Sequence, residues 1–301
     1  MRLRTMVSGS SVVGIAREVK DIVAAHDEYV KNCLSLDAGE YTLSPAARRI
    51  MSSYLYGRAC SGSPFKPRSG RGTRHIDKID TIAIELAKNL FHAKFVEYRS
   101  PTVTVANSLA VRVITKPGDT ILAMAYPIGH VDWATEKGST GHRNLKIVDM
   151  PFDEFLNVDL GAFTELARRF KPKVIIVGSA LVLFPYPVKE MKSIADEVGA
   201  RIMYDGAYAL GPIAGGLFPH PLEEGAYILT GSTGKTICGP KAGLVLCNQS
   251  DLYEKIQSVV VGYVSGYNHA RIAAMAMTLA EMSKFGKDFF GQTQKNARAL
   301  G

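Results

Sequence analysis

The 301-residue chain has few cysteines and no spacing that would let them act together. There is no C-x-x-C pair, and no histidines stand beside the cysteines at the intervals of zinc ligands. The sequence therefore predicts no metal centre and no disulfide scaffold, and it favours a reduced intracellular enzyme. The four cysteines are Cys33, Cys60, Cys238 and Cys247.

Long apolar runs are also missing. No stretch approaches the roughly 18 uninterrupted apolar residues of a membrane-spanning helix. The first residues include Arg2 and Arg4 but lack the sustained apolar core of a signal peptide. We therefore expect a cytoplasmic protein with no membrane partner.

Charge of one sign is not concentrated anywhere in the chain. The formal net charge is +8, yet Lys and Arg are scattered instead of forming one long run, which favours anionic small molecules over nucleic acid as partners. Apolar residues make up 47% and charged residues 21%, an ordinary globular composition that argues against disorder. The length allows one large domain or two ordinary ones.

Short apolar runs with strand character alternate with segments of helical period, which predicts an α/β fold with a mostly parallel sheet between helices. Between the apolar runs at 174–179 and 201–204, Pro187 begins a predicted helix that Gly199 ends. Residues 57–73 are rich in Gly and Pro and are predicted to be a loop. The predicted strands are 120–125, 145–150, 174–179, 201–204, 227–229 and 243–247. Further helices are predicted around Ile15–Ile22 and at 46–56 and 76–91, and after Cys247 the pattern stays helical through 271–284 and into 292–300.

Lys235 and Asp205 indicate the chemistry of the protein more specifically than any other residues of the sequence. Lys235 lies in a loop of Gly, Ser and Thr, and Asp205 ends an apolar run at the carboxyl edge of the predicted sheet, where ligands of such sheets bind. An aldehyde cofactor bound as a Schiff base needs one lysine for the imine and one carboxylate to keep its pyridinium nitrogen protonated. Alternatively, the lysine contacts solvent or a phosphate, and the aspartate only caps a turn.

A phosphate-binding loop is the competing interpretation of residues 231–236. The G-x-x-x-x-G-K-[ST] pattern requires glycine at position 229, where this chain has Leu229. The loop also comes late in the predicted sheet. A nucleotide-binding protein therefore stays an alternative to the cofactor hypothesis.

The block 204–246 resembles the serine hydroxymethyltransferase family of fold-type I pyridoxal-phosphate enzymes. The resemblance rests on Asp205, the turn at 214–216, Pro219-His-Pro221, Thr233-Gly-Lys235 and the run 239–243. Weaker matches at 39–42, 106–107, 117–119 and 294–298 extend it along the chain. It implies a helical arm over 1–45 and, over 46–301, a pyridoxal-phosphate-binding large domain with a seven-stranded type of sheet. The resemblance would place the family's small C-terminal domain after residue 301, so we expect either a fragment, or a partner chain that supplies this domain, or a different way of binding the substrate carboxylate.

The resemblance also implies roles for individual residues. Lys235 would form the imine, Asp205 would pair with the pyridinium nitrogen, and His130 would stack on the cofactor ring. Thr102 and Thr104 stand where the family has serines that bind the cofactor phosphate, and hydroxyls at a helix N-terminus suit that role. Further cofactor contacts would come from Ser179, Ser232 and Thr233.

Four departures from the family pattern lie around the expected substrate. Tyr56 replaces a glutamate that serves folate-dependent proton transfer, and Gly70 replaces a tyrosine. Gly234 and Tyr208 each replace a histidine. These changes leave a role for tetrahydrofolate in doubt. Tyr56 and Tyr208 become candidate proton carriers beside Lys235.

The expected function is a pyridoxal-phosphate enzyme that acts at the Cα of a small amino acid of the glycine, serine or threonine type. It would transfer an aldehyde-level fragment by an aldol-type reaction, as a homodimer with a shared active site. The family arginine that pairs with the substrate carboxylate belongs to the missing domain, and Arg58, Arg68, Arg71 and Arg74 are expected to be solvated loop charges. The alternatives are a folate-independent threonine aldolase or transaldolase-like enzyme, a nucleotide-binding protein, and a catalytically reduced homologue.

Overall fold

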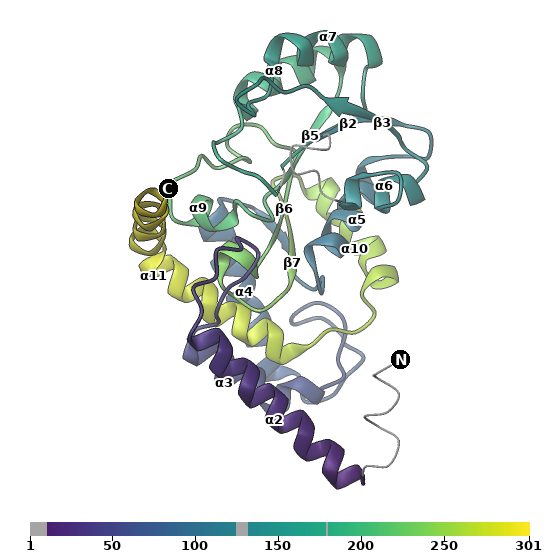
Figure 1. Cartoon of the computed structure of the whole chain (residues 1–301). Helices are drawn as coiled ribbons and strands as arrows, with labels where there is room; N and C mark the ends of the chain where they lie inside the picture. The colour runs from purple at the N-terminus through teal and green to yellow at the C-terminus, as the bar shows by residue number, and fades with distance from the viewer. Residues whose placement is uncertain (1–10, 125–131, 179) are drawn as a thin grey trace. The chain divides into compact units, whose positions relative to one another are not determined.

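The computed structural model describes residues 11–124, 132–178 and 180–301 (Figure 1). The chain divides into two compact units, residues 1–40 and 41–301. In the first unit, α2 (Val12–Lys31) begins at Ser11, whose hydroxyl accepts a hydrogen bond from the Gly14 amide. This bond satisfies one of the free amides of the first turn. None of the residues of α2 is buried.

Seven strands within the described ranges of the second unit form one sheet, in the order β1-β7-β6-β5-β4-β2-β3. The strands from β2 to β6 are parallel, whereas β7 is antiparallel to both β6 and β1. This confirms the predicted α/β fold. The bounds are β1 (Phe95–Glu97), β2 (Thr120–Met124), β3 (Lys146–Met150), β4 (Val174–Val177), β5 (Arg201–Asp205), β6 (Ile228–Ser232) and β7 (Gly243–Cys247).

The continuous apolar runs of the central strands follow from burial on both faces of the sheet. Successive side chains of a strand point to opposite faces. In β2, Leu122 belongs to one hydrophobic core and Ile121 to the other, and in β4 the same holds for Ile175 and Ile176. A strand covered on both sides needs apolar residues at every position, so its sequence shows no alternation.

Helices cover both faces of the sheet and complete the two hydrophobic cores. On one face of the sheet, α5 (Val103–Ile114) and α10 (Ser250–Tyr263) contribute buried side chains to the same core as Ile121. The core that contains Leu122 is completed by α4 (Arg74–Phe91), α7 (Leu160–Phe170), α8 (Val188–Val198), α9 (Leu210–Ala214) and α11 (His269–Leu300). No helix in the described part of the chain is long and apolar enough to cross a membrane.

Several boundaries differ from the prediction. The helix expected over 46–56 is divided into α3 (Pro45–Met51) and a 3-10 turn, η1 (Tyr54–Gly57). The helical pattern expected through 271–284 and into 292–300 is confirmed as one helix, α11. Gly286 and Gly291 weaken helix propensity in this segment. Packing overrides them, because the ring of buried Phe290 lies directly against α9.

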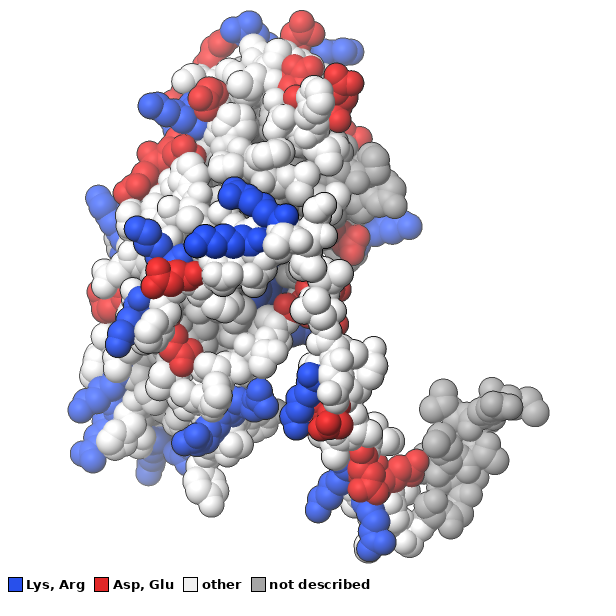
Figure 2. Space-filling view, turned by 60° about the vertical axis from the view of Figure 1, so that its left-hand side comes forward, with Lys and Arg blue, Asp and Glu red and all other residues white. Residues whose placement is uncertain are grey.

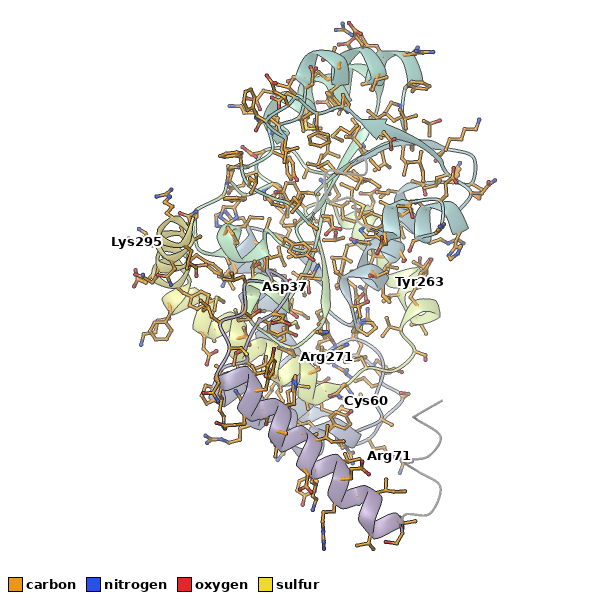
Figure 3. All side chains as sticks on the ribbon, in the orientation of Figure 1. Asp37, Cys60, Arg71, Tyr263, Arg271 and Lys295 are labelled. Atoms are coloured by element: carbon orange, nitrogen blue, oxygen red, sulfur yellow. The ribbon has the colours of Figure 1, made fainter. Side chains whose placement is uncertain are left out.

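The loop over 57–73 is confirmed, but the expectation that Arg68 is a solvated charge is wrong. Its side chain is 1% exposed, and its Nε lies 2.7 Å from Asp77 Oδ1. Its two Nη atoms bind Asp80 Oδ2 at 2.8 Å and Tyr267 Oη at 2.7 Å. Near Cys60 and Arg271, which are labelled in Figure 3, the loop also meets the first turn of α11, where His269 Nε2 lies 3.2 Å from the Cys60 carbonyl.

Candidate active site

Asp205 ends β5 as a buried carboxylate surrounded by donors. It is 2% exposed, and its Oδ1 accepts a hydrogen bond from the Ala207 amide at 2.9 Å. Its Oδ2 accepts from Asn107 Nδ2 at 2.9 Å and from Trp133 Nε1 at 2.8 Å. Burial raises the pKa of Asp205, while these hydrogen bonds and the positive charge of Lys235 oppose the rise. Such a carboxylate gains strongly from a cation bound next to it.

The two side-chain donors come from elements far from β5 in the sequence. Asn107 lies on α5 and is fully buried. Trp133 lies in the 3-10 turn η2 (Asp132–Ala134) and is the only tryptophan of the chain. The sequence analysis noted Asn107 only as a family match and did not identify Trp133. The sole signal for Trp133 was its uniqueness, which says nothing about its partner.

Lys235 begins the turn η3 (Lys235–Ile237), directly after the Gly/Ser/Thr segment that ends β6. Its backbone has φ +54°, in the left-handed region that non-glycine residues rarely adopt. Its Nζ lies 3.5 Å from the centre of the Tyr208 ring, in cation–π contact. The structure thus groups Lys235 with Asp205 and Tyr208, while their roles remain predictions.

Hydrogen bonds to residues that follow Lys235 fix the segment before it. Thr233 donates its hydroxyl to the Pro240 carbonyl at 2.6 Å, and its amide binds the Ala242 carbonyl at 3.1 Å. Both Ser232 and Thr233 are buried. In the structure the Thr233 hydroxyl therefore stabilises the loop that carries Lys235. Cofactor contacts by Ser232 and Thr233 remain predictions.

The N-terminus of α5 faces the same region. Thr102 is the N-cap residue, its hydroxyl accepts from the Val105 amide, and Thr104 lies in the first turn. Both threonines are exposed. The free amides and the helix dipole make such a terminus favourable for a phosphate. Nearby, the buried Ser100 Oγ has no hydrogen-bond partner among the described residues, and the same holds for Asn107 Oδ1.

A cavity of about 830 Å³ is bordered by the first turn of α5 and by η2. Trp133, which binds Asp205, lines it together with Thr104 of α5 and with Ser139 and His142 of α6 (Ser139–His142). Its size is in the range of small-molecule sites. A cofactor with a ring nitrogen and a phosphate fits the residues present. A helix N-terminus borders the cavity, the buried carboxylate of Asp205 is hydrogen-bonded to a residue that lines it, and unpaired polar atoms lie nearby.

Three predicted site residues are not placed in this group. Tyr56 lies on η1 with 64% of its surface exposed, and no contact with Lys235 or Asp205 occurs among the described interactions. His130 and Ser179 lie outside the described residues. Their predicted roles are therefore not tested.

The fold and the site define a class. A lysine in the loop after β6, a carboxylate at the end of parallel strand β5 and the exposed N-terminus of α5 are the arrangement of a fold-type I pyridoxal-phosphate enzyme.

Comparison with known proteins identifies the family. The family model described as serine hydroxymethyltransferase matches residues 12–301. A serine hydroxymethyltransferase of Methanocella arvoryzae is 39% identical over 95% of this chain and 67% of its own length. One from Methanosphaera stadtmanae is 39% identical, with coverages of 95% and 68%, and one from Methanocaldococcus jannaschii is 38% identical, with 95% and 67%. The chain belongs to the serine hydroxymethyltransferase family of pyridoxal-phosphate-dependent transferases, which confirms the predicted resemblance.

Proposed function

We propose that the protein acts at the Cα of glycine or serine and transfers an aldehyde-level fragment, as the names of its relatives indicate for them. The observation that carries the proposal is the grouping of Lys235 with the buried carboxylate of Asp205, which Trp133 connects to the cavity. Family membership and the fit of the cavity to pyridoxal phosphate support it.

Each end of the cofactor has residues suited to hold it. Lys235 would bind its aldehyde carbon and Asp205 its ring nitrogen, while Thr102 and Thr104 would bind its phosphate at α5. His130 against the ring, and Ser179, Ser232 and Thr233 as further contacts, complete the proposal. When bound, the cofactor supplies an electron sink for negative charge that develops at the substrate Cα.

Proton transfer is assigned to Lys235 and Tyr208. The Lys235 amine can exchange a proton with the substrate Cα once the substrate has taken its place on the cofactor. The Tyr208 ring, 3.5 Å from Lys235 Nζ, holds the ammonium in position. Tyr56 is exposed, so it would act in the active site of a second copy of the chain.

A homodimer with a shared active site is part of the proposal. An apolar groove of about 420 Å³ lies between α3, η1, α4 and α11, lined by residues such as Ile50, Leu55, Ile79 and Met277. Tyr56 is next to this groove on η1. Analytical ultracentrifugation should show a dimer at micromolar concentration, and a monomer would count against a shared site.

A second candidate is a folate-independent aldolase or transaldolase. The observation that favours it is the set of departures around Lys235 and Asp205, where Tyr208 contacts the lysine and a family histidine is absent. Exchange of the glycine Cα proton and cleavage of serine and threonine, each measured with and without tetrahydrofolate, separate the two. A rate that depends on tetrahydrofolate supports the hydroxymethyltransferase.

The partners and location that we propose are a small amino acid, an aldehyde and the cytoplasm. On the face shown in Figure 2, basic side chains are interspersed with acidic and uncharged ones. This distribution gives no extended basic surface on that face for nucleic acid. All four cysteines are unpaired, as expected in a reducing compartment.

Trp133 provides the test of cofactor binding. Pyridoxal phosphate bound next to Asp205 should quench the fluorescence of this only tryptophan, since the indole donates to the same carboxylate. The wild type should turn yellow and be bleached by borohydride. Lys235→Ala should lose the borohydride-trapped product, whereas Lys255→Ala, at an exposed position on α10, should behave as wild type. A wild type that takes up no pyridoxal phosphate would refute the proposal.

A further inference from the structure

Gly234, directly before Lys235, has a backbone conformation that any residue could adopt. Its φ is −73° and its ψ is −160°, in the extended region. A glycine is therefore not required here by backbone geometry. The reason for it must lie in what surrounds the position.

Tyr41 fills the space that a side chain at position 234 would need. A Cβ placed on Gly234 would lie 3.0 Å from both Cε1 and Oη of Tyr41 and 3.1 Å from its Cζ. These distances are shorter than ordinary carbon contacts, so a larger residue would displace the ring. The phenol thus lies where the side chain of the residue before Lys235 would project.

Tyr41 lies beside the turn that carries Lys235. Tyr41 is half-buried and comes four residues before α3, which packs against α11, and α11 also contacts η3. Burial raises the pKa of Tyr41, and the neighbouring thiol of Cys238 adds to the rise. The phenol therefore stays protonated at neutral pH. Tyr41 lies close to both ends of the short segment from Gly234 to Cys238.

This segment needs external support. Lys235 and Cys238 both have positive φ, at 54° and 58°. A non-glycine residue in such a conformation is strained and persists only where the surroundings hold it. Tyr208 contacts the Lys235 ammonium, and Tyr41 contacts the backbone immediately before it.

We propose that Tyr41 is a positioning residue of this active site: its ring packs on Gly234, fixes the turn that presents Lys235, and takes the place of a side chain at position 234. This inference rests on the proposed role of Lys235. It makes Gly234 and Tyr41 a matched pair. A residue larger than glycine at 234 should therefore destabilise the protein less when the ring at 41 is removed.

A double-mutant cycle tests the pairing. The variants are Tyr41→Ala, Gly234→Ala and the two combined, and the readout is the melting temperature of each protein without added cofactor. Gly234→Ala should lower the melting temperature. The loss should be smaller when Tyr41 is already alanine, because the clash is gone. Strictly additive effects would overturn the pairing.

The positioning role needs a readout that packing alone would not change. We expect Tyr41→Ala to slow the reaction of Lys235 with pyridoxal phosphate at least tenfold, followed by Trp133 fluorescence and by absorbance of the bound cofactor. Tyr41→Phe keeps the ring and should react within about twofold of the wild type, and it remains informative if Tyr41→Ala does not fold. Tyr263→Ala, on α10, is the control.

The outcomes separate this inference from the proposed function. If the wild type takes up no pyridoxal phosphate, the proposed function fails, while the melting-temperature cycle still tests the contact of Tyr41 with Gly234. If the cycle shows coupling but Tyr41→Ala reacts at the wild-type rate and gives the wild-type spectrum, Tyr41 is only a packing residue and the inference is overturned.

Discussion

At the scale of single residues, Asp205 shows how a site can be built to favour a cation. The carboxylate is buried and has three hydrogen-bond donors, two on one oxygen and one on the other. These donors offset part of the desolvation that raises its pKa. The remaining cost of burying this charge is relieved when a positively charged ring nitrogen binds. The charge of Asp205 should therefore strengthen the binding of the cofactor.

Asp205→Asn keeps the size of the side chain and removes its charge. A hydrogen bond to a charged group contributes about 1.5–3 kcal/mol, so the dissociation constant for pyridoxal phosphate should rise roughly ten- to hundredfold. Quenching of Trp133 measures it. Asp251→Asn, at an exposed position on α10, should leave the dissociation constant unchanged. An unchanged constant in Asp205→Asn would mean that the ring nitrogen binds elsewhere.

The sequence identified Asp205, Lys235 and Tyr208 but not Trp133 or Tyr41. Asp205 and Lys235 follow from the local pattern around the ends of strands, and Tyr208 follows from the family resemblance. Trp133 and Tyr41 act through contacts with residues 72 and about 190 positions away in the chain. No local pattern contains such contacts.

At the scale of elements, the loop over 57–73 is anchored by one arginine. Arg68 joins the loop to Asp77 and Asp80 of α4 and to Tyr267, just before α11. The Tyr98 hydroxyl also donates to Asp80 at 2.8 Å. The composition of the loop predicted its irregular backbone, but it could not show that a charged side chain lies inside the fold.

Replacing Arg68 should therefore lower the stability of the whole fold and not only that of a surface loop. Arg68→Met leaves two buried carboxylates without their cation, and breaking a buried ion pair in this way costs about 3–5 kcal/mol. Urea unfolding measures the change. Arg58→Met is the matched control, since Arg58 makes one long, exposed hydrogen bond to the Arg71 carbonyl, and it should change stability by less than about 0.5 kcal/mol. Equal effects would show that the Arg68 network contributes nothing.

At the scale of the whole molecule, the stability of the fold at acidic pH depends on histidines that are partly buried in the folded chain. The His220 ring stacks on His92 at 3.7 Å, and His92 Nδ1 lies 2.7 Å from Glu223 Oε1. Burial lowers the pKa of His220, the proximity of His92 lowers it further, and Glu223 opposes the shift. Burial likewise lowers the pKa of His269.

The direction of the pH effect follows from these shifts. The folded chain binds protons at His220 and His269 less readily than the unfolded chain, whose histidines have the ordinary pKa of 6.5. The stability that they contribute is complete above pH 6.5 and is lost as the pH falls through the lower folded values. Between pH 7.5 and 5.5 the melting temperature of the apoprotein should therefore fall less in His220→Gln than in the wild type. Identical slopes would contradict this.

The sequence by itself determined the class of fold, the family and the pairing of Lys235 with Asp205. Local sequence patterns predict each of these features. Apolar runs indicate strands buried on both faces, and a Gly/Ser/Thr segment precedes the lysine. The tertiary structure alone decided that Trp133 and Asn107 hold Asp205, that Arg68 is buried and that Tyr41 occupies the space at Gly234. The physical reason is that these contacts join segments far apart in the chain, and only the packing of helices on the sheet brings them within bonding distance.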